Sequence, residues 1–271
     1  MAKKSKLLHN LPMLILLIIA GFSIYLLPYF RSYYYDAFIE MYGLTNTQMG
    51  LLGTAYGVVA MVSYFIGGFV ADRFSARKLL SISLLITGLV GFVLLLPVGY
   101  PVVMAVHAIW GCSTILTFWP ALMKAIRMTA AQTEQSKAYG FFEGGRGIGN
   151  AFIMAAMLAL FAGVSASSGD QAALRAMIIS YSTINVIVGV LCFIFLKDNK
   201  GEASTKFDWA GTKKVLKMPH TWLIVCIMFC SYSLNCGYFL VTPYTTAVFG
   251  ASAVFAAAVA IMAQWVRPVG A

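Results

Sequence analysis

The stretch "GGFVADRFSARKLL", residues 67–80, is a short charged break between two long apolar runs, 47–71 and 79–98. One acidic and three basic residues are concentrated in it, whereas the flanking runs are apolar on every side. A run of about 20 apolar residues is long enough to cross the roughly 30 Å hydrocarbon core of a bilayer as an α-helix. The stretch therefore predicts a tight loop between two membrane-spanning helices.

The same alternation of apolar run and polar break extends over the whole chain. The 271 residues are 61% hydrophobic and only 10% charged, and the mean hydropathy of +0.84 lies far from that of a soluble domain. We count eight runs of spanning length and predict an all-α membrane protein. The runs are 11–36, 47–71, 79–98, 101–123, 137–163, 173–196, 222–244 and 252–271.

The basic residues indicate how these helices are oriented. With the N-terminus inside, all but four of the nineteen Lys and Arg fall on the cytoplasmic side, the exceptions being Arg31, Arg146, Arg175 and Arg267. The positive-inside rule then predicts a cytoplasmic N-terminus, followed by an uncleaved first helix. The net charge of +10 thus reflects membrane orientation and contact with anionic lipids, and indicates no nucleic-acid partner.

The longest polar segment divides the chain into two unequal parts. Residues 197–220 are strongly basic and separate six apolar runs from two. We therefore predict a six-helix N-terminal bundle over 1–196, a basic cytoplasmic linker over 197–220, and a two-helix second part over 221–271.

An enzyme is not indicated, because no set of nucleophile, base and orienting group lies in the apolar runs.

Metal and cofactor binding are not indicated either. The three His, at 9, 107 and 220, are scattered, and the five Cys lie in apolar runs without a CxxC pair. No two of the His stand at metal-ligand spacing. We therefore predict that the chain holds no metal ion and no cofactor.

The charged break resembles the loop that joins the second and third helices in the major facilitator superfamily. That family has Gly at the position of Ser75 and a basic residue at the position of Ala76, so this chain differs from the family pattern at two positions. The resemblance implies two six-helix bundles that alternate in access around a midplane site. It also implies a latch that holds one conformation. Its residues would be Gly68, Asp72, Arg73, Arg77 and Lys78.

Residues 29–50 and 118–147 resemble one branch of that superfamily, the organophosphate:phosphate antiporters and related organic-anion carriers. The nearest group is bacterial inner-membrane carriers of sulfosugar-utilisation type. The resemblance places substrate-binding positions at Arg31, Tyr64, Trp119, Arg146 and Asn235. In that branch two of these positions carry bases, where this chain has Tyr64 and Asn235. A phosphate ester calls for two bidentate bases, so a singly charged sulfonate or carboxylate is favoured over strict phosphate exchange.

Two charges lie within the fifth apolar run, in "GFFEGGRGIGN", residues 140–150. Glu143 and Arg146 are three apart, so both lie on one helix face and can pair. They lie roughly 9–14 Å into the core, where an unpaired charge costs at least about 2.5–3.5 kcal/mol. Gly145 and Gly149 expose the backbone to another helix or to a ligand.

This pair has two interpretations. It is either a structural ion pair, or a site in which Arg146 and Arg31 bind an anion while Glu143 neutralises Arg146 and accepts a coupling proton. We favour the second, hence a monomeric secondary transporter of a small organic anion (sugar acid, sulfonate or sugar phosphate), coupled to protons or to a second anion, in the bacterial inner membrane. The alternatives are a non-transporting membrane sensor and an inactive carrier. The resemblance implies about four further helices, so we expect a C-terminally truncated chain.

Overall fold

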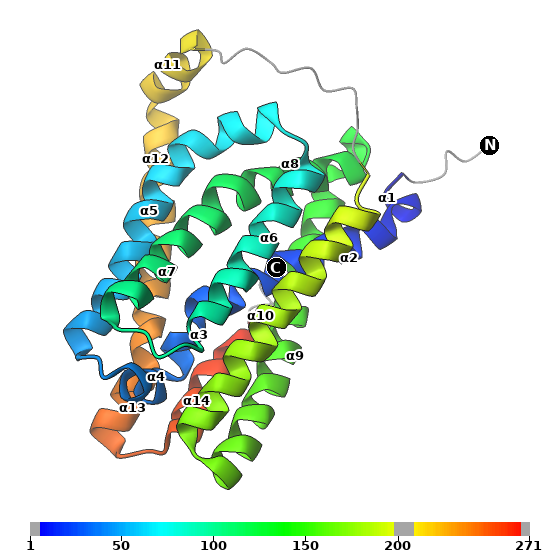
Figure 1. Ribbon diagram of the computed structural model, residues 1–271. Helices are drawn as coiled ribbons and strands as arrows, with labels where there is room; N and C mark the ends of the chain where they lie inside the picture. The colour runs from blue at the N-terminus through cyan, green and yellow to red at the C-terminus, as the bar shows by residue number, and fades with distance from the viewer. Residues whose placement is uncertain (1–5, 198–208, 267–271) are drawn as a thin grey trace.

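The computed structural model describes residues 6–197 and 209–266, and every regular element in these ranges is helical (Figure 1). The predicted all-α membrane fold is therefore confirmed. The first part of the chain contains α1 (Lys6–His9), α2 (Leu11–Ser23), α3 (Leu26–Tyr33), α4 (Tyr35–Tyr42), α5 (Asn46–Arg73), α6 (Ala76–Val93), α7 (Tyr100–Cys112), the π-helix η1 (Ser113–Phe118), α8 (Trp119–Thr129), η2 (Gln132–Glu134), α9 (Gln135–Ser168) and α10 (Asp170–Phe195).

The second part contains α11 (Trp209–Lys217), α12 (Pro219–Gly237), η3 (Tyr238–Leu240), α13 (Val241–Phe249) and α14 (Ala253–Val266). Of the predicted linker 197–220, residues 198–208 lie outside the described residues, and α11 with the start of α12 occupies the remainder. We refer to the elements up to α10 as the first unit and to α11 through α14 as the second unit.

Within the described residues, six helical segments are long and apolar enough to span a membrane. A seventh span is possible if α2 and α3, which meet at an angle of 43°, are counted as one. The eighth predicted run corresponds to α14, a shorter helix whose last described residue is Val266. The six segments are Asn46–Arg73, Ala76–Val93, Tyr100–Thr129, Gln132–Ser168, Asp170–Phe195 and Pro219–Phe249.

The helices place their connections at two ends of the molecule (Figure 1). The α5–α6 and α8–α9 connections and α11 gather at one end, which we call the basic end because these segments carry the clustered Lys and Arg. The α9–α10 turn, α4 and the α13–α14 connection lie at the other end, which we call the far end.

The charged break of residues 67–80 forms the tight loop that the sequence predicts. Helix α5 ends at Arg73 and α6 begins at Ala76. Ser75 caps α6, because the backbone N–H of Lys78 donates to its Oγ over 3.3 Å. Such a cap satisfies one of the free N–H groups at a helix start. The two apolar helices are thus joined by a two-residue link.

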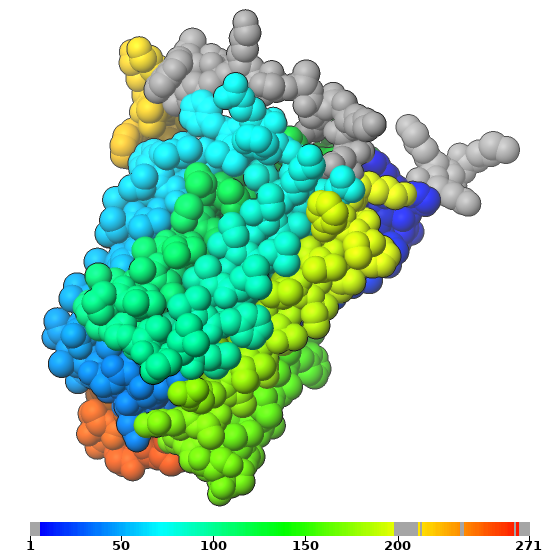
Figure 2. Space-filling model, viewed as in Figure 1, coloured from blue at the N-terminus to red at the C-terminus, as the bar shows by residue number. Residues whose placement is uncertain are grey.

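Small residues bring the helices of the first unit into close contact. A Cβ at Gly88 of α6 would lie 2.7 Å from the carbonyl oxygen of Ser182 on α10, and one at Gly189 of α10 would lie 3.1 Å from Leu84 Cβ. Such contacts let helix backbones approach, as is typical of membrane bundles. Figure 2 shows α6 and α10 side by side along one face of the molecule.

The Gly145/Gly149 pair of α9 faces another helix. A Cβ at Gly145 would lie 2.8 Å from Ile18 Cδ1, and one at Gly149 would lie 2.6 Å from Phe22 Cε1. Ile18 and Phe22 are one turn apart on α2, so the two helices meet as matched rows. The sequence predicts that these glycines expose the backbone either to another helix or to a ligand. The structure shows another helix, α2, at both glycines.

Candidate functional site

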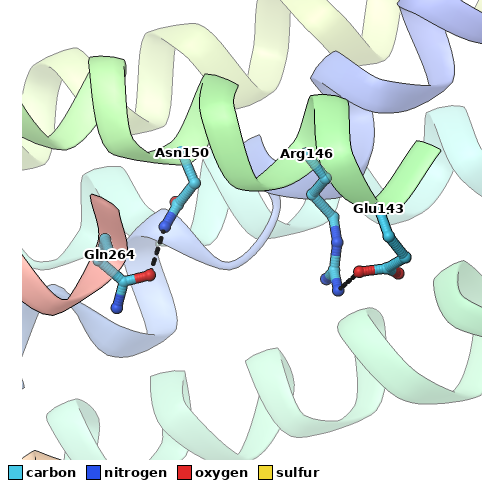
Figure 3. A network of polar contacts seen from close by, with 4 residues as sticks. All are labelled: Glu143, Arg146, Asn150 and Gln264. Carbon is cyan, nitrogen blue, oxygen red and sulfur yellow. Dashed lines mark hydrogen bonds and ion pairs between the residues drawn. The ribbon is translucent and has the colours of Figure 1, made fainter. Parts of the chain in front are cut away.

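Glu143 and Arg146 pair within α9, as the i,i+3 spacing predicts. Arg146 Nη2 donates to Glu143 Oε2 over 2.6 Å (Figure 3). The Arg146 side chain is 13% exposed and that of Glu143 is 37% exposed. The cation is therefore the more deeply enclosed partner, and the carboxylate lies on its more accessible side.

Aromatic rings surround the Arg146 guanidinium. Its carbon lies 5.4 Å from the ring centroid of Trp119 on α8 and 5.7 Å from that of Phe142 on α9 itself. Both distances are within the range of cation–π attraction. Arg146 Cδ passes Gly21 of α2, where an added Cβ would lie 3.4 Å away. The buried Nε has no hydrogen-bond partner among the described residues.

A π-helix determines the position of Trp119. Residues Ser113–Phe118 form η1, a π-helical segment between α7 and α8, and Trp119 is the first residue after it. Single π-turns inside α-helices occur frequently at functional sites, because they rotate the residues that follow. The sequence analysis placed Trp119 in the site but did not predict this irregularity.

A row of aromatic rings leads from Trp119 to the second unit. The ring of Tyr25 lies 6.3 Å from that of Trp119 and 6.1 Å from that of Tyr29. Tyr29 packs edge-on against Tyr56 of α5 at 5.6 Å. It also stacks on Phe239 of η3, with 5.3 Å between centroids and 5° between ring planes. The row thus joins the surroundings of Arg146 to the second unit.

Arg31 lies on α3 against the first turns of α5. Its Nη1 donates to the carbonyl oxygen of Met49 over 3.3 Å, and Gly53 leaves room for its guanidinium, since a Cβ there would lie 2.7 Å from Nη2. Its buried Nε has no hydrogen-bond partner within the described ranges. Arg31 and Arg146 contact different residues. The described contacts therefore do not join the two cations.

The two remaining predicted substrate-binding positions are Tyr64 and Asn235. Tyr64 lies on α5 and is 57% exposed. Asn235 belongs to α12, but its side chain lies outside what the structure describes.

The five predicted latch residues lie around the α5–α6 loop. Gly68, Asp72, Arg73 and Lys78 are exposed, and Arg77 is half-buried. The Arg77 guanidinium lies 5.3 Å from the ring centroid of Phe193 on α10. A Cβ at Gly68 would meet no described atom within 4 Å, whereas one at the preceding Gly67 would lie 3.0 Å from the carbonyl oxygen of Leu116. Close helix packing therefore falls on Gly67 in this conformation.

Lys124 makes a contact that the sequence analysis did not assign. Its Nζ donates over 3.1 Å to the carbonyl oxygen of Ala71, in the last turn of α5. The carbonyl groups at a helix C-terminus lack partners within their helix and carry partial negative charge. Lys124 therefore ties α8 to the end of α5, beside the latch loop.

A second polar group lies one turn along α9 from Arg146. Asn150 Nδ2 donates to Gln264 Oε1 over 3.0 Å, and Gln264 Nε2 donates to the hydroxyl oxygen of Tyr33 over 3.2 Å. The first bond links α9 to α14 of the second unit (Figure 3), and the second links α3 to α14. Sequence reasoning missed it, although an amide inside the apolar run of α14 is the signal that could have found it.

The described residues contain no group of three or more His, Cys, Asp or Glu that could hold a metal ion.

Fold and site together define a polytopic helical membrane protein with an Arg–Glu pair beside aromatic rings, near the junction of two helical units. The sequence matches the family model of the Major Facilitator Superfamily over residues 13–270, and the chain belongs to this family. The departures at Ser75 and Ala76 in the loop are thus tolerated within it.

Two relatives from Escherichia coli (strain K12) are similar over most of this chain. Inner membrane protein YqcE is 29% identical over 245 residues, which cover 87% of this chain and 56% of YqcE. Inner membrane protein YihN is 31% identical over 236 residues, which cover 84% of this chain and 55% of YihN. The chain thus spans about half the length of the curated relatives it matches.

Proposed function

We propose that this chain forms the anion-recognising part of a secondary transporter for a small organic anion. The protein would lie in a bacterial inner membrane with its basic end in the cytoplasm. Family membership and the two relatives named as inner membrane proteins support the transporter class and the membrane. The clustering of basic residues at one end supports the orientation.

The observation that carries the proposal is the state of Arg146. A guanidinium that is 13% exposed in an apolar bundle must be neutralised, because an uncompensated charge in the membrane is costly. One Nη donates to Glu143, while the buried Nε has no acceptor among the described residues. The cation therefore retains capacity for a second acceptor, and a carboxylate or sulfonate could supply it in a charge-assisted hydrogen bond.

Glu143 is suited to exchange with such a ligand. It is 37% exposed and lies one turn from Arg146 on the same helix, so it can turn away without moving the backbone. When an anion binds Arg146, it would take the place of Glu143 in the hydrogen bond from the guanidinium. We propose that this exchange between the anion and the carboxylate is the basis for coupling, with Glu143 as the group that carries the coupling proton.

The surroundings favour an anion with a single charge and an organic body. Trp119 provides a ring surface beside the guanidinium, and Tyr25 and Tyr29 continue the row of rings from it. The organophosphate:phosphate antiporters that this chain resembles carry bases at two positions that Tyr64 and Asn235 occupy here. Because one guanidinium balances one negative charge, a sugar acid or a sulfonate fits better than a phosphate ester.

Thermal unfolding of the purified chain in detergent tests the anion site. The ligands would be gluconate, a hexose sulfonate, a hexose 6-phosphate and the neutral hexose as control. We expect the carboxylate or the sulfonate to raise the unfolding temperature of the wild type, since a ligand that binds only the folded state stabilises it. The Arg146→Gln variant should lose the response, and Arg127→Gln, which removes an exposed base of α8, should keep it.

Unchanged stabilisation of Arg146→Gln, or no stabilisation of the wild type by any of the anions, would leave the pair with a structural role only. Arg31→Gln tests whether the second predicted base takes part. Where uptake into proteoliposomes can be measured, the double variant Arg31→Gln/Glu143→Gln should abolish the proton-driven component. Full proton-driven uptake by this variant would contradict the coupling role.

A further inference from the structure

The carboxamide of Gln264 joins three helices. Its oxygen accepts from Asn150 on α9, and its nitrogen donates to Tyr33 on α3. The Tyr33 ring also lies 6.3 Å edge-on from that of Tyr238 in η3. Because Gln264 belongs to the second unit and its two partners belong to the first, the amide links the two units directly.

This link lies where the second unit covers the first. Helix α14 starts at the far end, beside α4, and runs back along α9 (Figure 1). It packs on α9 and also meets α3 and α4. By contrast, the most apolar stretch of Pro219–Phe249 contributes no buried side chain among those that the structure describes. The described contacts between the units are therefore concentrated along α14, from the far end to the middle of α9.

The link is also next to the anion site. Asn150 follows Arg146 by four residues, so both side chains lie on one face of α9. Figure 3 shows them on the same side of the helix, with Gln264 reaching Asn150 from α14. A ligand on Arg146 would thus lie one helical turn from the contact that joins the units.

We propose that Gln264 is a positioning residue that holds the two units together midway along α9 and thereby keeps them closed from there to the far end. Its two hydrogen bonds hold α14 against α9 and α3, and their loss lets the units separate at that end. An amide suits this role because it carries a donor and an acceptor and no charge, so the contact can break and re-form without exposing an ion to lipid. This inference rests on the proposed transport function.

Distance measurement between two spin labels tests the proposal in the full chain. The labels would be attached at Ser168→Cys on α9 and Ala247→Cys on α13, both exposed, after replacement of the five native Cys. We expect one main distance in the wild type. In Gln264→Ala the ratio of this population to longer distances should fall roughly tenfold, as for the loss of two hydrogen bonds.

Tyr33→Phe removes one of the two bonds with almost no change in volume, and should give a smaller fall in the same ratio. It also keeps the proposal testable if Gln264→Ala does not fold. The matched control is Thr245→Val on α13, whose hydroxyl donates to Val241 within its own helix. This control should leave the distance distribution as in the wild type.

A wild-type distribution in both Gln264→Ala and Tyr33→Phe would overturn the proposal. A lower unfolding temperature without longer distances would also overturn it, because it would show a role in stability alone. The measurement needs no ligand, so its failure is distinguishable from failure of the anion site, which the response of Arg146→Gln reports separately.

Discussion

The guanidinium of Arg146 and the ring of Trp119 face each other across two helices, with 5.4 Å between the guanidinium carbon and the ring centroid. The contact joins α9, which carries the buried charge pair, to α8, which follows the π-helix. A change in the charge or position of the Arg146 guanidinium therefore changes the environment of the Trp119 indole.

Trp119 should report anion binding by its fluorescence. An anion on Arg146 changes the field at the indole and the distance of the cation, so it should alter the emission. Trp119→Phe should lose the anion-dependent change, whereas Trp265→Phe should retain it, because Trp265 packs on Phe152 instead. Titration of gluconate and of a hexose sulfonate into both variants is the measurement. An equal response in the two would show that the site lies elsewhere.

The Glu143–Arg146 pair should show coupling in a double-mutant cycle. Glu143→Gln leaves the enclosed Arg146 without its counter-ion and should lower the free energy of unfolding by about 1–3 kcal/mol. Replacing both residues by Gln removes the charge as well as its partner, and should cost less than the sum of the two single changes. Thermal unfolding of all four proteins measures this. Strict additivity would mean that the two groups do not interact in the folded chain.

Gly149 should tolerate no side chain, while Gly144 on the same helix should accept one. A Cβ at Gly149 would lie 2.6 Å from the Phe22 ring, whereas none of the described atoms lies within 4 Å of a Cβ at Gly144. We expect Gly149→Ala to destabilise the fold by about 1–3 kcal/mol through overpacking. Gly144→Ala should be neutral or stabilising by up to about 1 kcal/mol. Unfolding temperatures that fall equally in both would contradict the α2–α9 contact.

Lys124 should contribute more to stability than Arg127, its neighbour on α8. Lys124 donates to the Ala71 carbonyl of α5, and Arg127 is exposed. Lys124→Met should lower the unfolding free energy by about 1.5–3 kcal/mol, as for a hydrogen bond to a charged group. Arg127→Met should change it little. Equal effects in a thermal unfolding series would assign both residues to lipid anchoring.

Most of the fold could be predicted from local properties of the sequence. An apolar run long enough to cross the membrane must form a helix, because in lipid the backbone has to satisfy its own hydrogen bonds. Helices α5 and α6 and the loop between them can therefore be predicted from the sequence. The bend between α2 and α3 and the π-helix before Trp119 could not be predicted. Both depend on how a helix packs against its neighbours, and the apolar composition is the same with or without them.

The site divides in the same way. Pairing of Glu143 with Arg146 follows from their spacing on one helix, and the structure confirms it. Contacts between distant segments do not follow from spacing. The Gln264–Tyr33 bond joins residues 231 positions apart, and the sequence contains no pattern that selects Tyr33 among the neighbouring tyrosines. The joint role of Arg31 and Arg146 likewise remains a prediction.

The π-helix at Ser113–Phe118 lets the chain hold one extra residue in the helix that leads to Trp119. An α-helix turns by about 100° per residue, and a π-turn accommodates one residue more than the turn it replaces. Loss of a single codon from this segment would remove the extra residue and restore an uninterrupted helix, with Trp119 still on the same face of it. A gain or loss of one residue within this helix can therefore leave the face that carries Trp119 unchanged, a kind of change that residue-by-residue comparison at fixed positions does not register.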